Sequence, residues 1–278
     1  MTSMEKAMKR FIAVLLTVFT CLLGANNAFA ADNSNALQQI KKSGTLRVGL
    51  STFVPWAMRD KQGDLIGFEV DVAKRLAADA GLKVEFVPTA WDGIIPALLA
   101  GKFDVIIGGL TITPKRNMSV LFTHPYSYSA VQMVANKKLA SKMTTIDDYN
   151  KRSVTIAVRS GAYPVQTARK LFPKAKLRQF DDETQAFQEV LNGNAQAALA
   201  STPTPEQMVI KNPDSLFMPF KKSLTRYATG FAIRQGDFNL LNLLNNWIQV
   251  RTEDGWLNER YQYWFKTTDW QNQVNENN

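Results

Sequence analysis

The sequence predicts an α/β protein of two lobes, each a βαβ-type sheet flanked by helices, with the lobes joined by two hinge crossings. Three observations predict this class. Strand and helix patterns alternate between residues 46 and 110, the alternation returns between residues 153 and 210, and two extended segments connect the units. With 278 residues, 45% of them hydrophobic, the chain is long enough for two lobes with cores of their own.

The first unit begins with a buried-type strand at residues 46–50. Residues 67–81 follow with apolar side chains at helical spacing and a closing glycine, which is typical of an amphipathic helix. Strands are also expected at residues 83–87 and 104–110, with a short helix at residues 91–101. Because ligands bind beyond the carboxyl ends of parallel strands, the polar, aromatic and glycine residues after each strand are candidate site residues.

The second unit repeats this alternation. Its expected strands are residues 153–158, 175–180 and 195–200, and its expected helices are residues 165–172, 184–191 and a helix ending near residue 210. The two expected hinge crossings are the extended segments 127–136 and 226–234, and the last two helical patterns are residues 238–252 and 254–265.

The N-terminus has the pattern of a secretory signal peptide. Three cations within the first ten residues precede an apolar run at residues 11–24 and then the A-x-A sequence Ala28–Ala30. We expect cleavage after Ala30 and export to the periplasm; the alternative, a retained membrane anchor, is disfavoured because the apolar run is short for a bilayer. The only cysteine, Cys21, lies in this run and lacks a lipoprotein pattern before it, so the mature chain has no disulfide.

The charge of the chain excludes some function classes. The formal net charge is +9, but the cations are spread along the sequence, so we interpret them mainly as a solvated surface with a weak bias towards anionic ligands. Nucleic acid is not an expected partner of an exported protein. The single histidine, His124, rules out a multi-histidine metal site and disfavours a Ser-His-Asp triad. No metal or cofactor is expected.

Several motifs in order along the chain resemble one family. The segment GFEVDVAKRLAADA resembles the signature of the bacterial extracellular solute-binding proteins of family 3, which feed polar amino acids to ABC importers. The segments GTLRVGL, WDGIIPALLAGKFDVIIGGLTITPKR, NGNAQAALA and GFAIR also fit. The resemblance implies a two-lobed periplasmic-binding-protein fold. With the signal-peptide pattern and the two crossings, the expected parts are a signal peptide at 1–30, lobe 1 at 31–127, lobe 2 at 128–226, and a return to lobe 1 with C-terminal helices at 227–278.

The resemblance assigns Arg116 to the arginine that binds the carboxylate of the ligand, with a surface arginine as the alternative. A planar guanidinium can give a carboxylate two parallel hydrogen bonds, which the ammonium of the neighbouring Lys115 cannot. Gly109 and Thr111 match positions that present a backbone carbonyl and a hydroxyl to the ligand. A glycine lets a ligand approach the backbone closely, although a tight strand exit would also need one.

The loop RSGAY, residues 159–163, matches the lobe 2 loop that completes carboxylate binding in the family. It precedes a helix, so the backbone N–H groups of residues such as Ser160 and Ala162 favour an anion. Ala162 replaces the threonine common in relatives, which removes one hydroxyl contact. Arg159 adds a second possible cation to the cleft, with a surface arginine as the alternative.

Aromatic residues match the walls of the cleft in lobe 1. Phe53 and Trp91 correspond to positions that enclose the variable part of the ligand, where they could stack on a cation or a planar group. Trp56 is expected to face the core instead. Ser51 falls where relatives often carry a polar or acidic group for the side chain of the ligand.

Ser201 is the main departure from the family pattern. Amino-acid binders carry an aspartate at this place, which takes the α-ammonium of the ligand. A buried ammonium without a carboxylate partner would cost on the order of several kcal/mol. Either the ligand lacks the ammonium, or another acid, Asp182 or Glu206, supplies the charge.

Taken together, the residues and the resemblance predict a periplasmic, monomeric binding protein, not an enzyme. It would capture an amino acid or related small carboxylate and deliver it to an ABC transporter permease. Two alternatives stay open: a ligand sensor without a transporter, and a dehydratase-like enzyme on the same scaffold, which would need a positioned general acid or base in the cleft.

Overall fold

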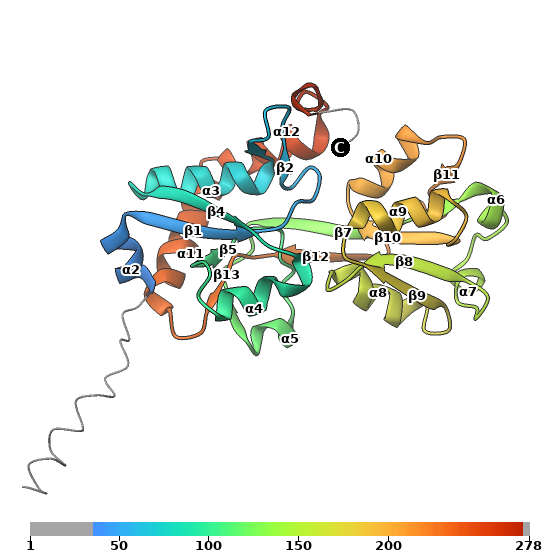
Figure 1. Ribbon diagram of the computed structural model, residues 1–278, viewed down its shortest axis with the longest axis horizontal. Helices are drawn as coiled ribbons and strands as arrows, with labels where there is room; N and C mark the ends of the chain where they lie inside the picture. Colours follow the sequence, from blue (N-terminus) through green and yellow to red (C-terminus); the bar gives the residue numbers. More distant parts are fainter. Residues whose placement is uncertain (1–35, 275–278) are drawn as a thin grey trace, which may run out of the picture. The chain divides into compact units, whose positions relative to one another are not determined.

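The computed structural model describes residues 36–274; the predicted leader at residues 1–30 lies outside them. The described chain carries two large sheets with flanking helices, so the predicted two-lobed α/β class is confirmed (Figure 1). We call the elements around the first sheet lobe 1 and those around the second sheet lobe 2. Between residues 36 and 274, no helix has the length and apolar character needed to cross a bilayer.

The sheet of lobe 1 has five strands in the order β4-β1-β5-β13-β6. Here β1 (Thr45–Leu50) pairs in parallel with β4 (Lys83–Pro88) and with β5 (Val105–Ile106). From the C-terminal part of the chain, β13 (Ala232–Arg234) enters antiparallel to both β5 and β6 (Val120–Phe122). The sheet is therefore mixed rather than wholly parallel.

The strand expected at residues 104–110 is shorter than its hydrophobic run suggests. Regular pairing in β5 ends at Ile106, and Gly109 has a φ of 69°, in the left-handed region. Because that conformation favours glycine and does not continue a strand, the chain leaves the sheet here. The loop that follows contacts the hinge through a bridge between Thr111 and Thr229.

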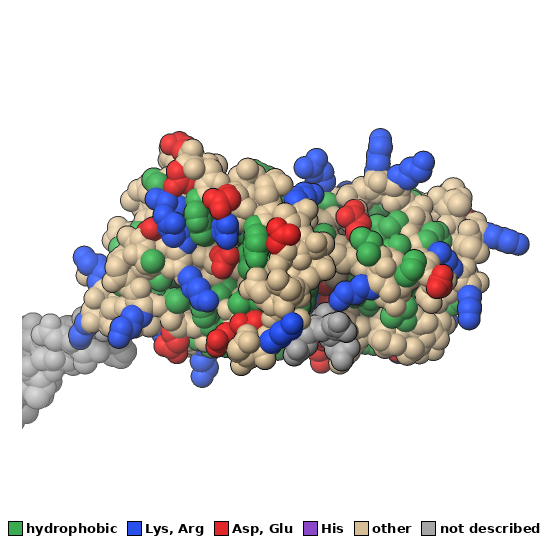
Figure 2. Space-filling view, turned by 90° about the horizontal axis from the view of Figure 1, so that it is seen from above, with side chains coloured by type: hydrophobic (Ala, Val, Ile, Leu, Met, Phe, Trp, Pro, Cys, Tyr) green, Lys and Arg blue, Asp and Glu red, His purple; other side chains and the backbone are tan. Residues whose placement is uncertain are grey.

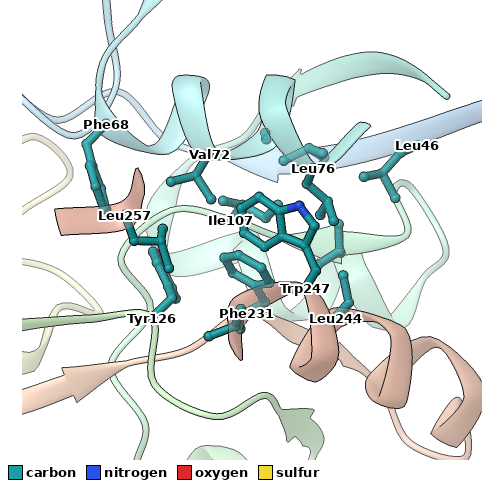
Figure 3. Close-up of a cluster of buried hydrophobic side chains, with 14 of the residues drawn as sticks. Leu46, Phe68, Val72, Leu76, Ile107, Tyr126, Phe231, Leu244, Trp247 and Leu257 are labelled. Carbon is teal, nitrogen blue, oxygen red and sulfur yellow. The ribbon is translucent and has the colours of Figure 1, made fainter. Parts of the chain in front are cut away.

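Helices pack against the lobe 1 sheet and bury its apolar side chains. They are α2 (Ala36–Ser43), α3 (Phe68–Asp79), α4 (Ile94–Leu99), α11 (Phe238–Glu253) and α12 (Trp256–Lys266). Figure 3 shows Leu76 of α3 and Trp247 of α11 pointing toward one another, with Ile107 and Phe231 nearby. The indole of Trp247 donates a hydrogen bond of 2.9 Å to Asp79 Oδ2, so its polar group is satisfied at the edge of the core.

The lobe 2 sheet has the order β11-β7-β10-β8-β9. In it, β8 (Thr155–Arg159) pairs in parallel with β9 (Lys176–Phe180) and β10 (Ala197–Ser201). By contrast, β7 (Ser127–Asn136) runs antiparallel to β10 and to β11 (Leu216–Phe217). The carboxyl ends of β8, β9 and β10 thus meet at one edge of the sheet.

Two hydrophobic clusters hold the helices of lobe 2 to its sheet. One contains Val165 of α8, and the other contains Phe187 of α9. The helices of this lobe are α6 (Lys137–Ala140), α7 (Ile146–Tyr149), α8 (Tyr163–Leu171), α9 (Glu183–Leu191) and α10 (Thr204–Lys211).

The two crossings between the lobes form one ribbon. Five residue pairs join β7 to β12 (Thr225–Thr229) in antiparallel register, from Ser127↔Thr229 to Val131↔Thr225. Before Ser127 the chain belongs to lobe 1 through β6, and after Thr229 it returns there through β13. We call this pair of strands the hinge ribbon.

Shorter elements complete the described chain. They are β2 (Met58–Arg59), β3 (Leu65–Ile66), η2 (Trp91–Gly93), α5 (Pro114–Asn117) and η3 (Gln271–Gln273). On the face that Figure 2 shows, lysine and arginine side chains are scattered over both lobes and do not gather into a stripe. This distribution agrees with the interpretation of the net charge as a solvated surface.

Candidate ligand-binding cleft

A cavity of about 30 Å³ lies between residues of the two lobes. Its walls come from the carboxyl-terminal ends of strands and from the hinge ribbon, and they consist of Phe53, Trp56, Trp91, Gly108, Gly109, Thr111, Arg159, Ala162, Tyr163, Glu183, Ser201 and Tyr227. This volume suits about one water molecule. The structure therefore has the lobes closed over a small space, which we call the cleft.

Most of the sequence-predicted site residues lie on the walls of the cleft. They are Phe53, Trp91, Gly109, Thr111, Arg159, Ala162 and Ser201. Ser51 and Arg116 lie beside the walls and act through contacts described below. Ser160 is not a wall residue, and its backbone N–H donates to Phe180 O at 2.7 Å, so this N–H is already used.

Arg116 joins the two lobes through its guanidinium. Nη1 donates to Thr111 O in lobe 1 at 2.9 Å, and Nη2 donates to Gly161 O in lobe 2 at 2.8 Å. Thr113 Oγ1 caps the start of α5 by accepting from Arg116 N, which fixes the backbone beneath the side chain. Burial lowers the pKa of Arg116 to about 10, so the group is still a cation at neutral pH. Arg116 forms no ion pair within 4 Å among residues 36–274.

The backbone at Gly109 is held from behind by a buried acid. Gly109 N donates to Tyr126 Oη at 3.1 Å, and this hydroxyl lies 2.7 Å from both carboxyl oxygens of Glu69 on α3. Glu69 is fully buried, and burial raises its pKa to about 8, although the hydrogen bond from Tyr126 opposes that shift. Glu69 is therefore mainly a neutral acid at pH 7, and its hydrogen bonds fix the cleft loop.

The aromatic wall in lobe 1 has two layers. Phe53 and Trp56 lie nearly parallel, with centroids 6.1 Å apart and an interplanar angle of 4°. Trp56 also packs edge-on against Phe265 in the core and is only 2% exposed. The expected core contact of Trp56 is thus present, but the same side chain also backs Phe53 and reaches the wall of the cleft.

Arg159 crosses from lobe 2 to lobe 1. Its Nη2 donates to Ser51 Oγ at 2.6 Å, and its guanidinium carbon lies 5.5 Å from the ring centroid of Trp91. The side chain is buried, with 7% of the residue exposed, and Nε donates to Asp181 O. Burial lowers the pKa of Arg159, while Glu183 and other nearby acids raise it. The interpretation of Arg159 as a surface arginine is therefore wrong.

Neutral hydroxyl groups occupy the place where the family pattern has an aspartate. Ser201 Oγ and Tyr227 Oη form a short hydrogen bond. Burial raises the pKa of Tyr227, and hydrogen bonds from Ser129 and Ser201 oppose this, so the phenol stays neutral. Hydroxyl groups can accept a hydrogen bond from an ammonium, but they do not neutralise its charge.

Glu183 is the acid that reaches the cleft, and sequence reasoning missed it. Burial raises the pKa of Glu183 to about 8, Arg159 opposes this shift, and Asp182 adds to it. The side chain forms no hydrogen bond or ion pair within 4 Å among the described residues. The sequence could have indicated Glu183 as a site residue, because it starts α9 just beyond the carboxyl end of β9. Ligands of α/β proteins bind beyond the carboxyl ends of parallel strands.

The two acids proposed from sequence have other partners. Asp182 caps α9, where Oδ1 accepts from Thr184 N at 2.6 Å. Glu206 Oε1 accepts from Gln132 Nε2 at 2.6 Å and lines a separate cavity of about 800 Å³ beside the hinge ribbon. Neither residue lines the cleft, so we reassign the acid of the site to Glu183. No group of three potential metal-binding residues was found in the described part of the chain.

Comparison with known proteins identifies a family model and relatives that resemble most of the chain. The family model for bacterial extracellular solute-binding proteins, family 3, matches residues 46–267. The L-cystine-binding protein TcyJ of Escherichia coli (strain K12) is 30% identical over 82% of this chain and 85% of its own. Cyclohexadienyl dehydratase of Pseudomonas aeruginosa is 25% identical over 91% and 94%. The crystal structure of a binding component of an ABC transporter from Wolinella succinogenes, complexed with lysine, has a TM-score of 0.77 and 38% identity, covering 82% and 99%.

Proposed function

Because the chain belongs to the bacterial extracellular solute-binding proteins of family 3, we propose that it captures an amino acid or related small carboxylate in the cleft and delivers it to the permease of an ABC importer. The observation that carries this proposal is the position of Arg116. Its guanidinium, which has no ion-pair partner in the described part of the chain, lies beside a small closed cleft and touches both lobes. A guanidinium in that position suits a carboxylate.

The proposed mechanism has two steps. In the open form, the carboxylate of the ligand binds Arg116 while its variable part contacts Phe53 and Trp91. Lobe 2 then closes through the loop at residues 159–163, and Thr111 and Gly109 supply hydroxyl and backbone contacts. Closing brings Ala162 and Ser201 to the ligand, and the bend occurs in the hinge ribbon. The carboxylate of the ligand, which is a stronger hydrogen-bond acceptor, would replace the carbonyl groups of Thr111 and Gly161 as partners of Arg116.

The location and partner follow from the same proposal. Export through a leader cleaved after Ala30 would place the protein in the periplasm, where it would act as a monomer and bring its ligand to the permease. The related L-cystine-binding protein and the lysine complex support an amino acid as the ligand class. Nothing in this scheme requires a cofactor.

A second candidate function, a dehydratase, is favoured by one observation. Glu183 has a pKa of about 8 and lines the cleft, so it is largely protonated at neutral pH. Such a group could act as a general acid in the loss of water. The 25% identical dehydratase makes this candidate worth testing. Proton NMR after long incubation separates the two functions when the probe carries a hydroxyl that can leave as water, such as L-serine or a hydroxylated cyclohexadienyl amino acid, since a transport protein leaves that probe unchanged.

The main proposal is tested by measuring ligand binding and the radius of gyration of the protein. Thermal unfolding with a panel of amino acids and keto acids should reveal a ligand that raises the melting temperature by mass action. Arg116→Met should lower the affinity for that ligand about 10- to 150-fold, because hydrogen bonds to charged groups contribute about 1.5–3 kcal/mol. Lys115→Met, the exposed neighbouring cation, is the matched control and should bind normally.

Small-angle scattering gives an independent readout. The protein with saturating ligand should have a smaller radius of gyration than the ligand-free protein. Equal radii would contradict the closing step, and an unchanged affinity in Arg116→Met would contradict the role of that side chain.

A further inference from the structure

The cleft holds a second arginine that no acid among residues 36–274 neutralises at short range. Arg159 is buried at the Ser51 end of the cleft and forms no ion pair within 4 Å among residues 36–274. A buried cation without a partner is unfavourable, and a ligand that carries a negative group there would remove that cost. Ser51 does not supply such a charge, since its hydroxyl only accepts a hydrogen bond.

Two wall residues of the cleft carry indole donors that are unused within the described chain. The indole nitrogens of Trp56 and Trp91 are buried and lack a partner within the described chain, and both residues line the cleft. Buried N–H groups without acceptors are rare and unfavourable. The guanidinium of Arg159, which can only donate hydrogen bonds, suits an acceptor-only group such as a carboxylate.

Glu183 adds one acid to the two cations, and the ammonium of a bound ligand would hold its carboxyl group in the ionised form. The charged side chains at the cleft are then Arg116, Arg159 and Glu183. The complementary ligand carries two negative groups and one positive group. An amino acid with an acidic side chain has this set of charges: its α-carboxylate, its side-chain carboxylate and its ammonium.

We propose that this chain binds an acidic amino acid, with Arg159 holding the side-chain carboxylate and Glu183 holding the ammonium. The inference rests on the proposed function and narrows its ligand class. It also gives this chain a ligand of different side-chain charge from that of the related Wolinella succinogenes protein, which was complexed with lysine. A cationic side chain in this cleft would lie beside Arg159 and would be repelled by it.

The experiment measures ligand selectivity by calorimetry at pH 7.5. The probes are L-aspartate, L-glutamate, L-glutamine, L-lysine and 2-oxoglutarate. At least one acidic amino acid should bind about 10- to 150-fold more tightly than L-glutamine or L-lysine. The amine-free 2-oxoglutarate should bind more weakly than L-glutamate, because it leaves Glu183 without a cation. Binding of L-lysine or L-glutamine as tight as that of both acidic amino acids would overturn the proposal.

Two variants assign the roles, each with a control. Arg159→Met should reduce the preference for L-glutamate over L-glutamine about 10- to 150-fold, whereas Arg152→Met, an exposed cation of lobe 2, should leave that preference unchanged. Glu183→Gln should reduce the preference for L-glutamate over 2-oxoglutarate, and Glu259→Gln, an exposed acid, should not. Each readout is a ratio of two affinities, so a loss of folded protein cannot imitate it.

The outcomes also separate this proposal from the proposed function. If a neutral or basic amino acid binds tightly and closes the lobes, the transport proposal stands and the acidic ligand class is wrong. If no amino acid or small carboxylate binds, the proposed function itself is wrong. An unchanged preference in Arg159→Met contradicts the placement of the side-chain carboxylate even when L-glutamate binds.

Discussion

Arg159 Nη2 donates a hydrogen bond of 2.6 Å to Ser51 Oγ across the cleft. This contact links the end of β8 in lobe 2 with the residue after β1 in lobe 1. It lies in the same closed interface as the bond from Arg116 to Gly161 O and a bond from Thr204 Oγ1 to Val54 O. Two of these three interlobe bonds come from the arginines that we assign to the ligand.

Changing the acceptor of this bond should change the ligand charge that the cleft accepts. In Ser51→Asp, a carboxylate would meet Arg159 and neutralise it, so an anionic side chain of the ligand would lose its partner. We expect the affinity for an acidic amino acid to fall at least about 10-fold, measured by calorimetry. Ser51→Ala, which removes the hydroxyl but adds no charge, should change this affinity less. Equal effects of the two substitutions would contradict the electrostatic explanation.

A methyl group at Gly161 should hinder closure. This residue has a φ of 68°, and an added Cβ would lie 3.1 Å from Asp92 Cα in the other lobe. Gly161→Ala should therefore weaken ligand binding and raise the radius of gyration of the ligand-bound protein. The control is Gly236→Ala, which has a φ of 89° and no atom within 4 Å of the added Cβ. Both substitutions introduce backbone strain of about 1–2 kcal/mol, but only the first obstructs the interface.

The titration of Glu69 should lower the free energy of unfolding of the protein as pH rises. Its pKa is raised to about 8, so its favourable contribution is complete below the ordinary pKa near 4.5 and is lost as pH rises through about 8. A shift of this size corresponds to roughly 3–5 kcal/mol. Glu69→Gln keeps an acceptor for Tyr126 and cannot ionise, so in urea unfolding it should be more stable than the natural chain at pH 8.5.

The comparison between pH values isolates Glu69 from other groups. At pH 5 the natural chain and Glu69→Gln should have similar free energies of unfolding, because the acid is then neutral. Glu85→Gln, at an exposed position on β4, should show no pH-dependent difference. A constant difference between Glu69→Gln and the natural chain at all pH values would contradict the titration of Glu69.

Glu183 should give ligand binding a pH dependence of the opposite direction. An ammonium stabilises the ionised carboxylate, so binding of an amino acid releases a proton and strengthens as pH rises toward about 8. The affinity for L-glutamate should increase about fivefold between pH 7 and pH 8. The charged and titratable neighbours of this group are Arg159, Asp182 and Tyr227. Glu183→Gln should abolish the increase, and an increase that persists would assign it to another group.

The order of strands and helices was predictable because the local hydrophobic periodicity of the sequence indicates each element. The expected helix at residues 67–81 is α3, and the expected crossing at residues 127–136 is β7. The antiparallel insertion of β13 between β5 and β6 was not predictable, because it depends on pairing between segments more than 100 residues apart. The loop that follows β5 likewise contains Gly109 in the left-handed region, a conformation that hydrophobicity does not reveal.

The cleft was predictable where its residues follow strands of the first unit. Phe53, Trp91, Gly109 and Thr111 all follow strand ends, and these ends meet at one edge. Glu183 was missed because it stands in a run of three acids, Asp181 to Glu183, and sequence alone does not say which of them faces the cleft. The hydroxyl pair of Ser201 and Tyr227 depends on the register between distant strands.

The hinge ribbon also offers a position from which closure of the two lobes can be followed by fluorescence. Tyr128 lies on β7, is 61% exposed, and lines the cavity of about 800 Å³ beside the ribbon. Because β7 and β12 are paired over five positions, a bend of the ribbon changes the surroundings of Tyr128 without requiring the site itself to be altered. The only cysteine, Cys21, lies in the predicted leader. A mature chain carrying Tyr128→Cys would thus take a single fluorescent dye there and serve as a reagentless sensor for its own ligand.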